Sequence, residues 1–191
     1  MTICVYGASS ELIDKEYITV TEELGRKMAD RGHSLVYGAG AQGLMGAVAR
    51  GVYEKNGTIV GVAPSFFNVD GVLFENCTEM ISTETMRQRK QIMEDRADCF
   101  IMTPGGIGTF EEFFEILTLK QLARHKKAIA VLNIKGYYDT MEKMMQGAID
   151  GKFMKPECSN LYKVFTDIDE MLDYLEEYDD DFADVYKMKN I

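Results

Sequence analysis

The sequence predicts an α/β fold, a Rossmann-like doubly wound parallel sheet with helices on both faces. Short runs of strand-forming residues alternate with helical segments along the chain, which indicates βαβ units. Some of these runs, such as Cys99 to Met102, are apolar throughout, as expected for a strand buried on both faces of a parallel sheet. A chain of 191 residues with 46% hydrophobic content can bury one substantial core. We therefore expect a single domain over residues 1–191, ending in an acidic tail.

The expected elements alternate from the start of the chain, where the apolar run Ile3 to Tyr6 begins the first strand. Strands are expected near residues 2–7, 34–37, 58–63, 98–102, 128–132 and 161–165. Helices are expected near residues 14–31, 43–55, 84–97, 109–123, 138–150 and 167–178. The helix that starts near residue 109 has an apolar face for packing on the sheet, because its apolar side chains recur at helical spacing: Phe110, Phe113, Phe114 and Leu117.

Two segments are less regular. The connection from Pro64 to Thr78 carries the adjacent Phe66 and Phe67, and either a lid or pocket wall or an ordinary surface loop fits it. The tail from Glu176 to Asp184 is strongly acidic, which is typical of a solvated helix end or a frayed terminus.

Charge and cysteine usage exclude several classes of protein. A net charge of −10 provides no basic surface for nucleic acid, so any phosphate must be bound locally. No run approaches the roughly 18 apolar residues of a membrane span, and no basic segment or cleavage site marks a secretion signal. The scattered cysteines are typical of reduced core residues in a cytoplasmic protein: Cys4, Cys77, Cys99 and Cys158. His33 and His125 lack partners at metal-ligand or triad spacing, so we expect structural histidines and no metal site.

The most informative stretch runs from Thr103 to Glu112. It contains the end of a strand, a glycine turn, a helix start and a carboxylate within ten residues. Backbone N–H groups left free at a helix start attract an anion, and glycines let the anion approach closely. The sequence therefore predicts a phosphate site at residues 103–109. We call this segment the second glycine turn, because another glycine-rich turn precedes it in the chain.

Glu112 has two interpretations from spacing alone. Thr109 and Glu112 have the spacing of a capping box, in which the glutamate folds back to the helix start. The helix dipole also favours Glu111 and Glu112 near that end whatever the chemistry. The neighbouring anion site favours the other interpretation, a carboxylate placed for attack at the anomeric carbon of a bound phosphosugar.

Arg89 does not fit the solvated basic face of its helix. It shares the apolar stripe with Met86, Ile92 and Met93. The polar stripe is formed by Arg87, Lys90, Gln91 and Glu94. A cation that faces the core needs an anionic ligand, a carboxylate or a structural ion pair as its partner.

A first glycine turn, residues 38–46, follows the second strand and contains GxGxxG. A dinucleotide fingerprint follows the first strand, however, and is answered by an acidic residue about 20 positions later. Here the next strand ends in Ala63 and Pro64, so a glycine-lined nucleotide pocket is preferred over NAD binding, with a turn that binds no ligand as the alternative. The first strand ends in Gly7 to Ser10, and three turns should thus meet at one sheet edge. Ser9 and Ser10 have helix capping as a competing role.

With these residues identified, the sequence resembles the LOG ("lonely guy") family, the cytokinin riboside 5'-monophosphate phosphoribohydrolases, labelled lysine decarboxylase-like in older usage. The resemblance covers about residues 2–165 and is strongest at two motifs. The family's PGGxGTxxE signature is matched in full by Pro104, Gly105, Gly106, Gly108, Thr109 and Glu112. A second motif, a methionine two residues before an Arg-Lys pair, is approximated by Met86, Arg87, Gln88, Arg89 and Lys90.

The resemblance implies that Arg89 and Glu112 are catalytic and that Gly106 to Thr109 hold a 5'-phosphate. Lys90 and Thr118 would complete the substrate contacts. We also include in the substrate site members of all three turns: Gly105, Ile107, Glu111, Gly38, Gly40, Gly43, Met45 and Ser9. Two departures from the family pattern bear on base preference, namely Ala39 in place of a glycine and Ser65 in place of a glutamate.

The implied activity is hydrolysis of the N-glycosidic bond of adenosine or N6-modified adenosine 5'-monophosphates, by a cytoplasmic homodimer without a metal or organic cofactor. A carboxylate can stabilise the positive charge that develops on the ribose and activate water. Arg89 would either contact the departing purine or orient Glu112. The alternative is a noncatalytic carrier of a nucleotide or of the molybdenum cofactor with a similar fold. Nothing marks a Schiff-base lysine for a literal lysine decarboxylase.

Overall fold

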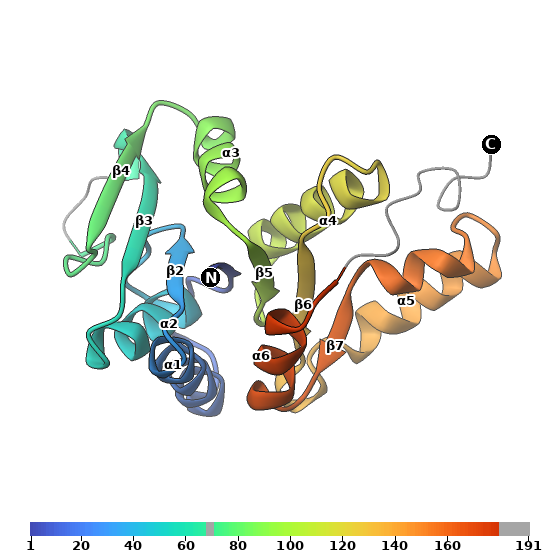
Figure 1. The fold of residues 1–191 in the computed structure, drawn as a ribbon, viewed down its shortest axis with the longest axis horizontal. Helices are drawn as coiled ribbons and strands as arrows, with labels where there is room; N and C mark the ends of the chain where they lie inside the picture. The colour runs from blue at the N-terminus through green and yellow to red at the C-terminus, as the bar shows by residue number, and fades with distance from the viewer. Residues whose placement is uncertain (68–70, 180–191) are drawn as a thin grey trace.

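A computed structural model describes residues 1–67 and 71–179 of the chain and confirms the α/β fold. Its sheet has seven parallel strands in the order β4-β3-β2-β1-β5-β6-β7, which run from left to right in Figure 1. The strands are β1 (Thr2–Tyr6), β2 (Ser34–Tyr37), β3 (Ile59–Pro64), β4 (Glu79–Thr83), β5 (Cys99–Met102), β6 (Ala128–Leu132) and β7 (Lys163–Phe165).

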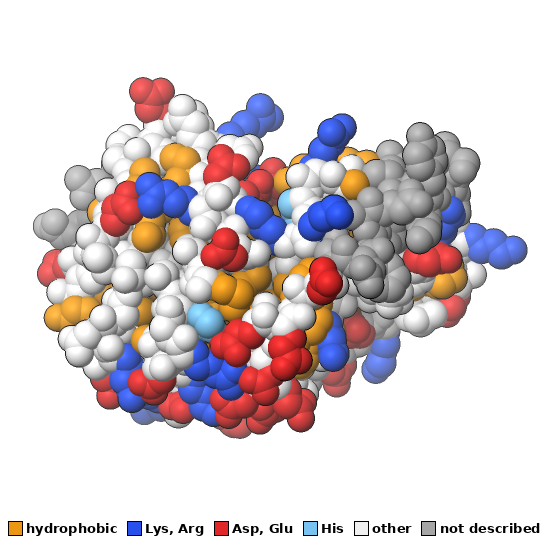
Figure 2. Space-filling view, viewed as in Figure 1, with side chains coloured by type: hydrophobic (Ala, Val, Ile, Leu, Met, Phe, Trp, Pro, Cys, Tyr) orange, Lys and Arg blue, Asp and Glu red, His pale blue; other side chains and the backbone are white. Residues whose placement is uncertain are grey.

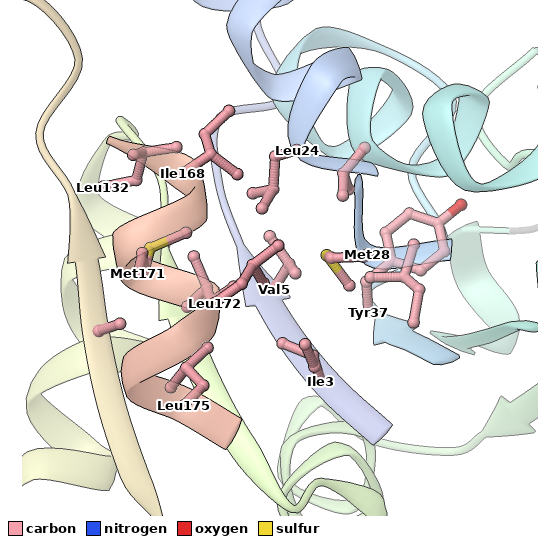
Figure 3. Packing of buried hydrophobic residues seen from close by; sticks show 14 of the residues in the cluster. Ile3, Val5, Leu24, Met28, Tyr37, Leu132, Ile168, Met171, Leu172 and Leu175 are labelled. Atoms are coloured by element: carbon pink, nitrogen blue, oxygen red, sulfur yellow. The ribbon is translucent and has the colours of Figure 1, made fainter. Parts of the chain in front are cut away.

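Helices cover both faces of the sheet. They are α1 (Lys15–Asp30), α2 (Gly43–Glu54), α3 (Met86–Arg96), α4 (Ile107–Gln121), α5 (Asp139–Asp150) and α6 (Ile168–Glu176). Buried side chains of α1, α2 and α6 form one core with one face of the sheet, and Figure 3 shows Leu24 and Met28 of α1 near Leu172 of α6. Buried side chains of α3, α4 and α5 form the other core, which includes Phe113 and Leu117 of α4 as expected from their spacing.

Strand β4 is missing from the sequence-based expectation. Its side chains from Glu79 to Ser82 are exposed or half-buried, and only Thr83 is buried. This strand lies at the edge of the sheet and lacks the continuous apolar run that identifies the central strands. The cue used for the other strands was therefore absent.

The connection after β3 packs on the first glycine turn. Ser65 to Phe67 form a short 3-10 helix, and residues 68–70 lie outside the described part of the chain. Leu73 then forms a bridge with Gly40, while the Phe74 N–H donates to the Ala39 carbonyl at 2.9 Å. Phe74 is buried, whereas Phe66 and Phe67 are exposed. The aromatic anchor of this loop is Phe74 rather than the adjacent pair.

An ion-pair network joins α6 to α1, and Figure 2 shows acidic and basic side chains intermingled over these two helices. Arg31 pairs with Asp169, Asp173 and Glu176. The Nε2 of His33 lies 2.7 Å from the Glu176 carboxylate, so this histidine has the expected structural role. The acidic tail thus begins in a paired residue, and its part from residue 180 onward lies outside the described residues.

The sheet reverses its strand order between β1 and β5, which lie next to each other. Ligands of open α/β sheets bind outside the carboxyl ends of the strands at such a switch point. All four cysteines are free, and Cys4, Cys99 and Cys158 are buried. Among the helices within residues 1–67 and 71–179, none is long and apolar enough to cross a membrane.

Candidate active site

The three small-residue turns meet at Ala8, just beyond the end of β1. The Ala8 N–H donates to the Pro104 carbonyl of the second glycine turn at 3.0 Å. The Ala8 carbonyl accepts from the N–H groups of Leu44 and Met45 at 2.8 and 3.2 Å, at the start of α2. The expected convergence of these turns on one sheet edge is confirmed.

The first glycine turn is filled by the protein's own atoms. A Cβ at Gly38 would lie 1.7 Å from Nη2 of Arg89, and a Cβ at Gly40 would lie 2.7 Å from Cε of Met45. Gly43 has a φ of +58°, and its Cβ would lie 2.5 Å from the Ala8 carbonyl oxygen. The space that a nucleotide pocket needs at Gly38 and Gly40 is therefore occupied by Arg89 and Met45. These glycines are explained by close internal packing and backbone conformation.

Ala39, in place of the family's usual glycine, has a φ of 61° and a fully buried side chain. A Cβ at Gly61 would lie 3.0 Å from the Ala39 methyl group. The extra methyl group is thus directed at β3 and is enclosed by protein. It does not reach the open space at the sheet edge.

The second glycine turn, by contrast, is open at the start of α4. Gly106 is the N-cap and gives no side-chain hydrogen bond, because it has no side chain to do so. Within the described ranges, no acceptor bonds the N–H of Ile107, Gly108 or Thr109. A Cβ at Gly106 or Gly108 would meet no atom of residues 1–67 or 71–179 within 4 Å. Gly105 differs, since Thr109 Oγ1 lies 2.1 Å from the position of its Cβ. The start of α4 therefore has the free amides and open approach that bind an anion.

Glu112 is not a helix cap. Because α4 starts at Ile107, two residues earlier than predicted, Thr109 lies inside the first turn instead of at the N-cap. Glu112 then lies four residues after Gly108 and on the same helix face. Its Cα lies about 7.5 Å along the helix axis from that of Ile107, and its side chain leans back toward the helix start. The capping-box interpretation is thus removed by the helix boundary.

Glu112 and Arg89 form a largely buried ion pair. Arg89 Nη1 donates to Glu112 Oε1 at 2.9 Å, with side-chain exposures of 7% and 11%. Burial raises the pKa of the Glu112 carboxyl above its ordinary value of 4.5, and the charge of Arg89 opposes this rise. The pair places a partly desolvated carboxylate one helical turn beyond the open amides of α4.

Arg89 is held in place from three sides. Its Nε donates to the Val62 carbonyl of β3 at 3.2 Å, and its Nη2 occupies the space beside Gly38. Arg89 and Met93 are both buried on α3, so the expected position of this cation on the apolar stripe is confirmed. The glycine of the second strand and the arginine of α3 are thus parts of one packing arrangement.

Lys90 and Glu111, both expected to contact substrate, contact each other. The Lys90 ammonium pairs with the carboxylates of Glu111 and Glu115 on α4. This second ion-pair rung lies beside the Arg89–Glu112 pair and joins the same two helices. Its geometry indicates that Lys90 fixes α3 relative to α4.

Comparisons with known proteins identify the family. A family model described as "possible lysine decarboxylase" matches residues 45–175. The chain is also similar to curated relatives that carry a different name. A probable cytokinin riboside 5'-monophosphate phosphoribohydrolase of Oryza sativa subsp. japonica, LOGL5, is 36% identical over 92% of this chain and 72% of its own length. The chain belongs to the LOG family.

A second LOG relative and two solved structures extend this result. The cytokinin riboside 5'-monophosphate phosphoribohydrolase LOG2 of Arabidopsis thaliana is 34% identical over 95% of this chain and 86% of its own length. The molybdenum cofactor carrier protein of Chlamydomonas reinhardtii superposes with a TM-score of 0.70 at 22% identity, over 92% of this chain and 96% of that one. The molybdenum cofactor binding protein of Rippkaea orientalis gives 0.70 at 17% identity, over 92% and 94%. At these identities the two structures show a shared fold alone.

Other residues implied by the LOG resemblance are not brought to the second glycine turn. Thr118 is exposed on α4, about 16 Å along the axis from the helix start. Ser9 is exposed at the sheet edge, and α1 is capped by Asp14, whose side chain accepts from the Glu16 N–H at 3.0 Å. Ser9 therefore stays open as a substrate contact, since capping is done elsewhere.

Two tyrosines at this site were missed by the sequence analysis. Tyr137 Oη donates to the Gly105 carbonyl at 2.6 Å, and Tyr138 Oη donates to the Thr103 carbonyl at 2.7 Å. Both residues follow β6, the strand next to β5 in the sheet. Their position just beyond a strand's carboxyl end was the available signal.

The two histidines have structural positions. His125 Nε2 lies 2.8 Å from the Ile116 carbonyl at the end of α4. In the part of the chain that the structure describes, no group of three or more His, Cys, Asp or Glu residues could hold a metal ion.

Proposed function

We propose that this protein is a nucleoside 5'-monophosphate phosphoribohydrolase, acting on adenosine or N6-modified adenosine monophosphates. The reaction breaks the bond between C1' of the ribose and the base nitrogen. Water supplies a hydroxyl group to C1' and a proton to the base, so the products are the free base and ribose 5-phosphate. Family membership supports the reaction class. The observation that carries the proposal for this chain is a buried carboxylate one turn beyond an open helix start on the same face.

The phosphate is assigned to the first turn of α4. The N–H groups of Ile107, Gly108 and Thr109 are the donors, and the positive end of the helix dipole adds to their attraction. A net charge of −10 gives no general attraction for phosphate, so this local site must supply the binding. The open space above Gly106 and Gly108 supports this assignment.

Glu112 is assigned as the catalytic carboxylate. A phosphate on the first turn of α4 would place the attached ribose along the helix face that bears Glu112, four residues after Gly108. As the bond to the base breaks, positive charge develops on the ribose, and a nearby carboxylate stabilises it. The raised pKa of Glu112 also makes it a better base for the attacking water.

Arg89 is assigned to orient Glu112. Its guanidinium binds the carboxylate and is itself fixed by Val62 and the gap at Gly38. Its charge also opposes the effect of burial and so favours the ionised form of Glu112. A noncatalytic carrier of this fold has no need for such a carboxylate beside its ligand. We further expect a cytoplasmic homodimer that requires neither metal nor organic cofactor.

The test offers AMP, isopentenyladenosine monophosphate and the two unphosphorylated nucleosides to the wild-type protein and measures free base. The wild type should release base from a monophosphate and much less from its nucleoside. Glu112→Gln should lower kcat by about 10²- to 10⁴-fold, the usual contribution of a positioned acid–base group. Arg89→Met should also lower kcat, because Glu112 loses its orientation.

The control variant is Tyr162→Phe, which removes a 2.6 Å hydrogen bond to Glu142 on α5. Its turnover should equal that of the wild type. Absence of base release from both monophosphates would sink the hydrolase proposal and favour a carrier. Equal turnover of nucleosides and monophosphates would instead refute the phosphate site on α4.

A further inference from the structure

Three successive backbone carbonyl groups of the second glycine turn each accept a hydrogen bond from another part of the protein. The Thr103 carbonyl accepts from Tyr138 Oη at 2.7 Å, and the Gly105 carbonyl accepts from Tyr137 Oη at 2.6 Å. Between them, the Pro104 carbonyl accepts from the Ala8 N–H at 3.0 Å. No carbonyl in this run is left to turn toward the open space at the start of α4.

This arrangement bears on anion binding because a peptide unit has its N–H and C=O on opposite sides. Holding the Gly105 carbonyl therefore directs the Gly106 N–H the other way. Glycine-rich backbone has access to many conformations, and rotation of this peptide would exchange the N–H for a carbonyl oxygen. A carbonyl oxygen repels an anion, whereas a row of N–H groups attracts it.

The two tyrosines are themselves firmly held. The Tyr138 N–H donates to Asn133 Oδ1 at 2.7 Å, and Asn133 Nδ2 donates to Asp139 Oδ1 at 2.8 Å. The Tyr138 ring is 1% exposed and meets Phe110 of α4 edge to face at 6.2 Å. The Tyr137 ring meets Tyr138 at 4.9 Å and Tyr17 of α1 at 6.1 Å, both edge to face. Each hydroxyl group thus acts from a fixed ring.

We propose that Tyr137 and Tyr138 are positioning residues of the anion site. Tyr137 holds the Gly105 carbonyl so that the Gly106 N–H joins those of residues 107–109 as a phosphate donor, and Tyr138 fixes the start of the second glycine turn. The role rests on the proposed function, since it concerns the phosphate of that substrate. Neither tyrosine needs to touch substrate. Such preorganisation lowers the cost of binding because the turn does not have to be ordered when the anion arrives.

Tyr137 gives the sharper test of the two. Its side chain is 41% exposed, so loss of its hydroxyl group disturbs no buried core. The experiment compares the binding of ribose 5-phosphate and ribose by calorimetry, in the wild type, Tyr137→Phe, Tyr138→Phe and the control Tyr162→Phe. The control loses a hydrogen bond of the same 2.6 Å length, from Tyr162 to Glu142, away from the turn.

The expected result is specific to phosphate. Tyr137→Phe should weaken ribose 5-phosphate binding by about 3- to 10-fold, the equivalent of one hydrogen bond, and leave ribose binding unchanged. In turnover of AMP, KM should rise by a similar factor while kcat changes less. Tyr138 holds the Thr103 carbonyl, which precedes Pro104 and therefore shares its peptide unit with no N–H group. Tyr138→Phe should thus give a smaller phosphate-specific loss than Tyr137→Phe, and Tyr162→Phe should match the wild type in every measurement.

The outcomes separate this inference from the function on which it rests. If the wild type prefers ribose 5-phosphate to ribose and both turn variants bind it as well as the wild type does, the positioning role is wrong and the function stands. If the wild type shows no preference for the phosphate, the anion site and the proposed function fail together. A loss of affinity shared equally by Tyr162→Phe would reveal a global effect and overturn the positioning role.

Discussion

The two glycine turns lie at the same sheet edge, but the helices that follow them differ in whether their first backbone N–H groups are free. At the start of α2, the N–H groups of Leu44 and Met45 are taken by the Ala8 carbonyl. At the start of α4, the corresponding groups of Gly108 and Thr109 have no acceptor among the described residues. Both turns are rich in glycine and both precede a helix, yet only the second keeps its amides for a ligand.

The difference shows what the glycines of each turn are for. In the first glycine turn, Gly38 makes room for the guanidinium of Arg89. Gly43 adopts a positive φ and lies close to the backbone of Ala8. In the second glycine turn, a Cβ at Gly106 or Gly108 would have no atom of the described residues within 4 Å. The first glycine turn therefore packs against the Arg89–Glu112 pair, and the second is open where we propose that the phosphate binds.

The largest effect should come from filling the space at Gly38. In Gly38→Ala the new methyl group would lie 1.7 Å from Nη2 of Arg89, so the guanidinium must leave the position from which it binds Glu112. A displacement of about 1 Å costs on the order of 10²-fold in rate, so kcat for AMP should fall at least that far. Gly147→Ala on α5, where a Cβ meets nothing within 4 Å, is the control. Wild-type turnover in Gly38→Ala would mean that Arg89 placement does not matter.

An alanine substitution should lower the free energy of unfolding in the first glycine turn and raise it in the second. Gly43→Ala forces an alanine to a φ of +58° with its Cβ 2.5 Å from the Ala8 carbonyl oxygen, so unfolding free energy should fall by roughly 2–4 kcal/mol. Gly108→Ala lies in the first turn of α4 with open space around it and should gain up to about 1 kcal/mol. Denaturant titration measures both. Equal losses at the two positions would erase the distinction between filled and open turns.

Substitutions in the Lys90–Glu111–Glu115 ion pairs test whether the proposed catalytic pair depends on the spacing of α3 and α4. Lys90→Met should lower kcat for AMP several-fold with little change in KM, and Glu111→Gln combined with Glu115→Gln should do the same. The triple variant should lose no more than either parent, because residues that act as one unit are not additive. A rise in KM confined to Lys90→Met would identify Lys90 as a substrate contact instead.

The acid side of the pH profile of kcat should report the pKa of the Glu112 carboxyl, which burial raises and Arg89 lowers. Because burial raises the pKa of this carboxyl above 4.5, kcat should fall on the acid side at a pH above that value. Arg89 lowers the pKa of Glu112, so the residual activity of Arg89→Met should have its acid limb at higher pH. An unshifted limb in this variant would show that another group titrates there.

The smallest effect concerns Glu94, a half-buried residue of α3. Burial, with Glu115 adding to it, raises the pKa of Glu94 from 4.5 to about 7. Between these values the unfolded chain has released the proton that the folded protein keeps, so this group's contribution to stability declines as pH rises from 4.5 to 7. Glu94→Gln should reduce that decline in denaturant titrations at pH 5 and pH 8. An unchanged difference between the two pH values would contradict the assigned pKa.

The sequence anticipated the central strands and the buried position of Arg89 for clear reasons. Strands such as β5 are continuous apolar runs, and Arg89 is a cation on an apolar stripe, so each leaves a local signal. Strand β4 leaves none, because its edge position needs no apolar run. What lies beside each glycine also depends on contacts between distant segments. Gly38 and Arg89 are 51 positions apart along the chain, and no spacing rule connects them.

The roles of Tyr137 and Tyr138 were hidden for the same physical reason. Their hydrogen bonds to the second glycine turn span 32 and 35 positions and depend on the placement of β6 beside β5. Likewise, Thr109 and Glu112 have the spacing of a capping box, but the helix does not start at Thr109. A shift of the start from the predicted residue 109 to Ile107 moved Glu112 from the cap region to the second turn.

The most direct test of the central claim follows the backbone amides of the two helix starts as ribose 5-phosphate is added, in nitrogen–proton correlation spectra of the wild-type protein. The claim is that the phosphate binds the free amides of α4. The signals of Ile107, Gly108 and Thr109 should then shift with a common saturation curve, while those of Leu44 and Met45 stay nearly fixed because the Ala8 carbonyl holds them. Larger shifts at Leu44 and Met45, with residues 107–109 unmoved, would contradict it.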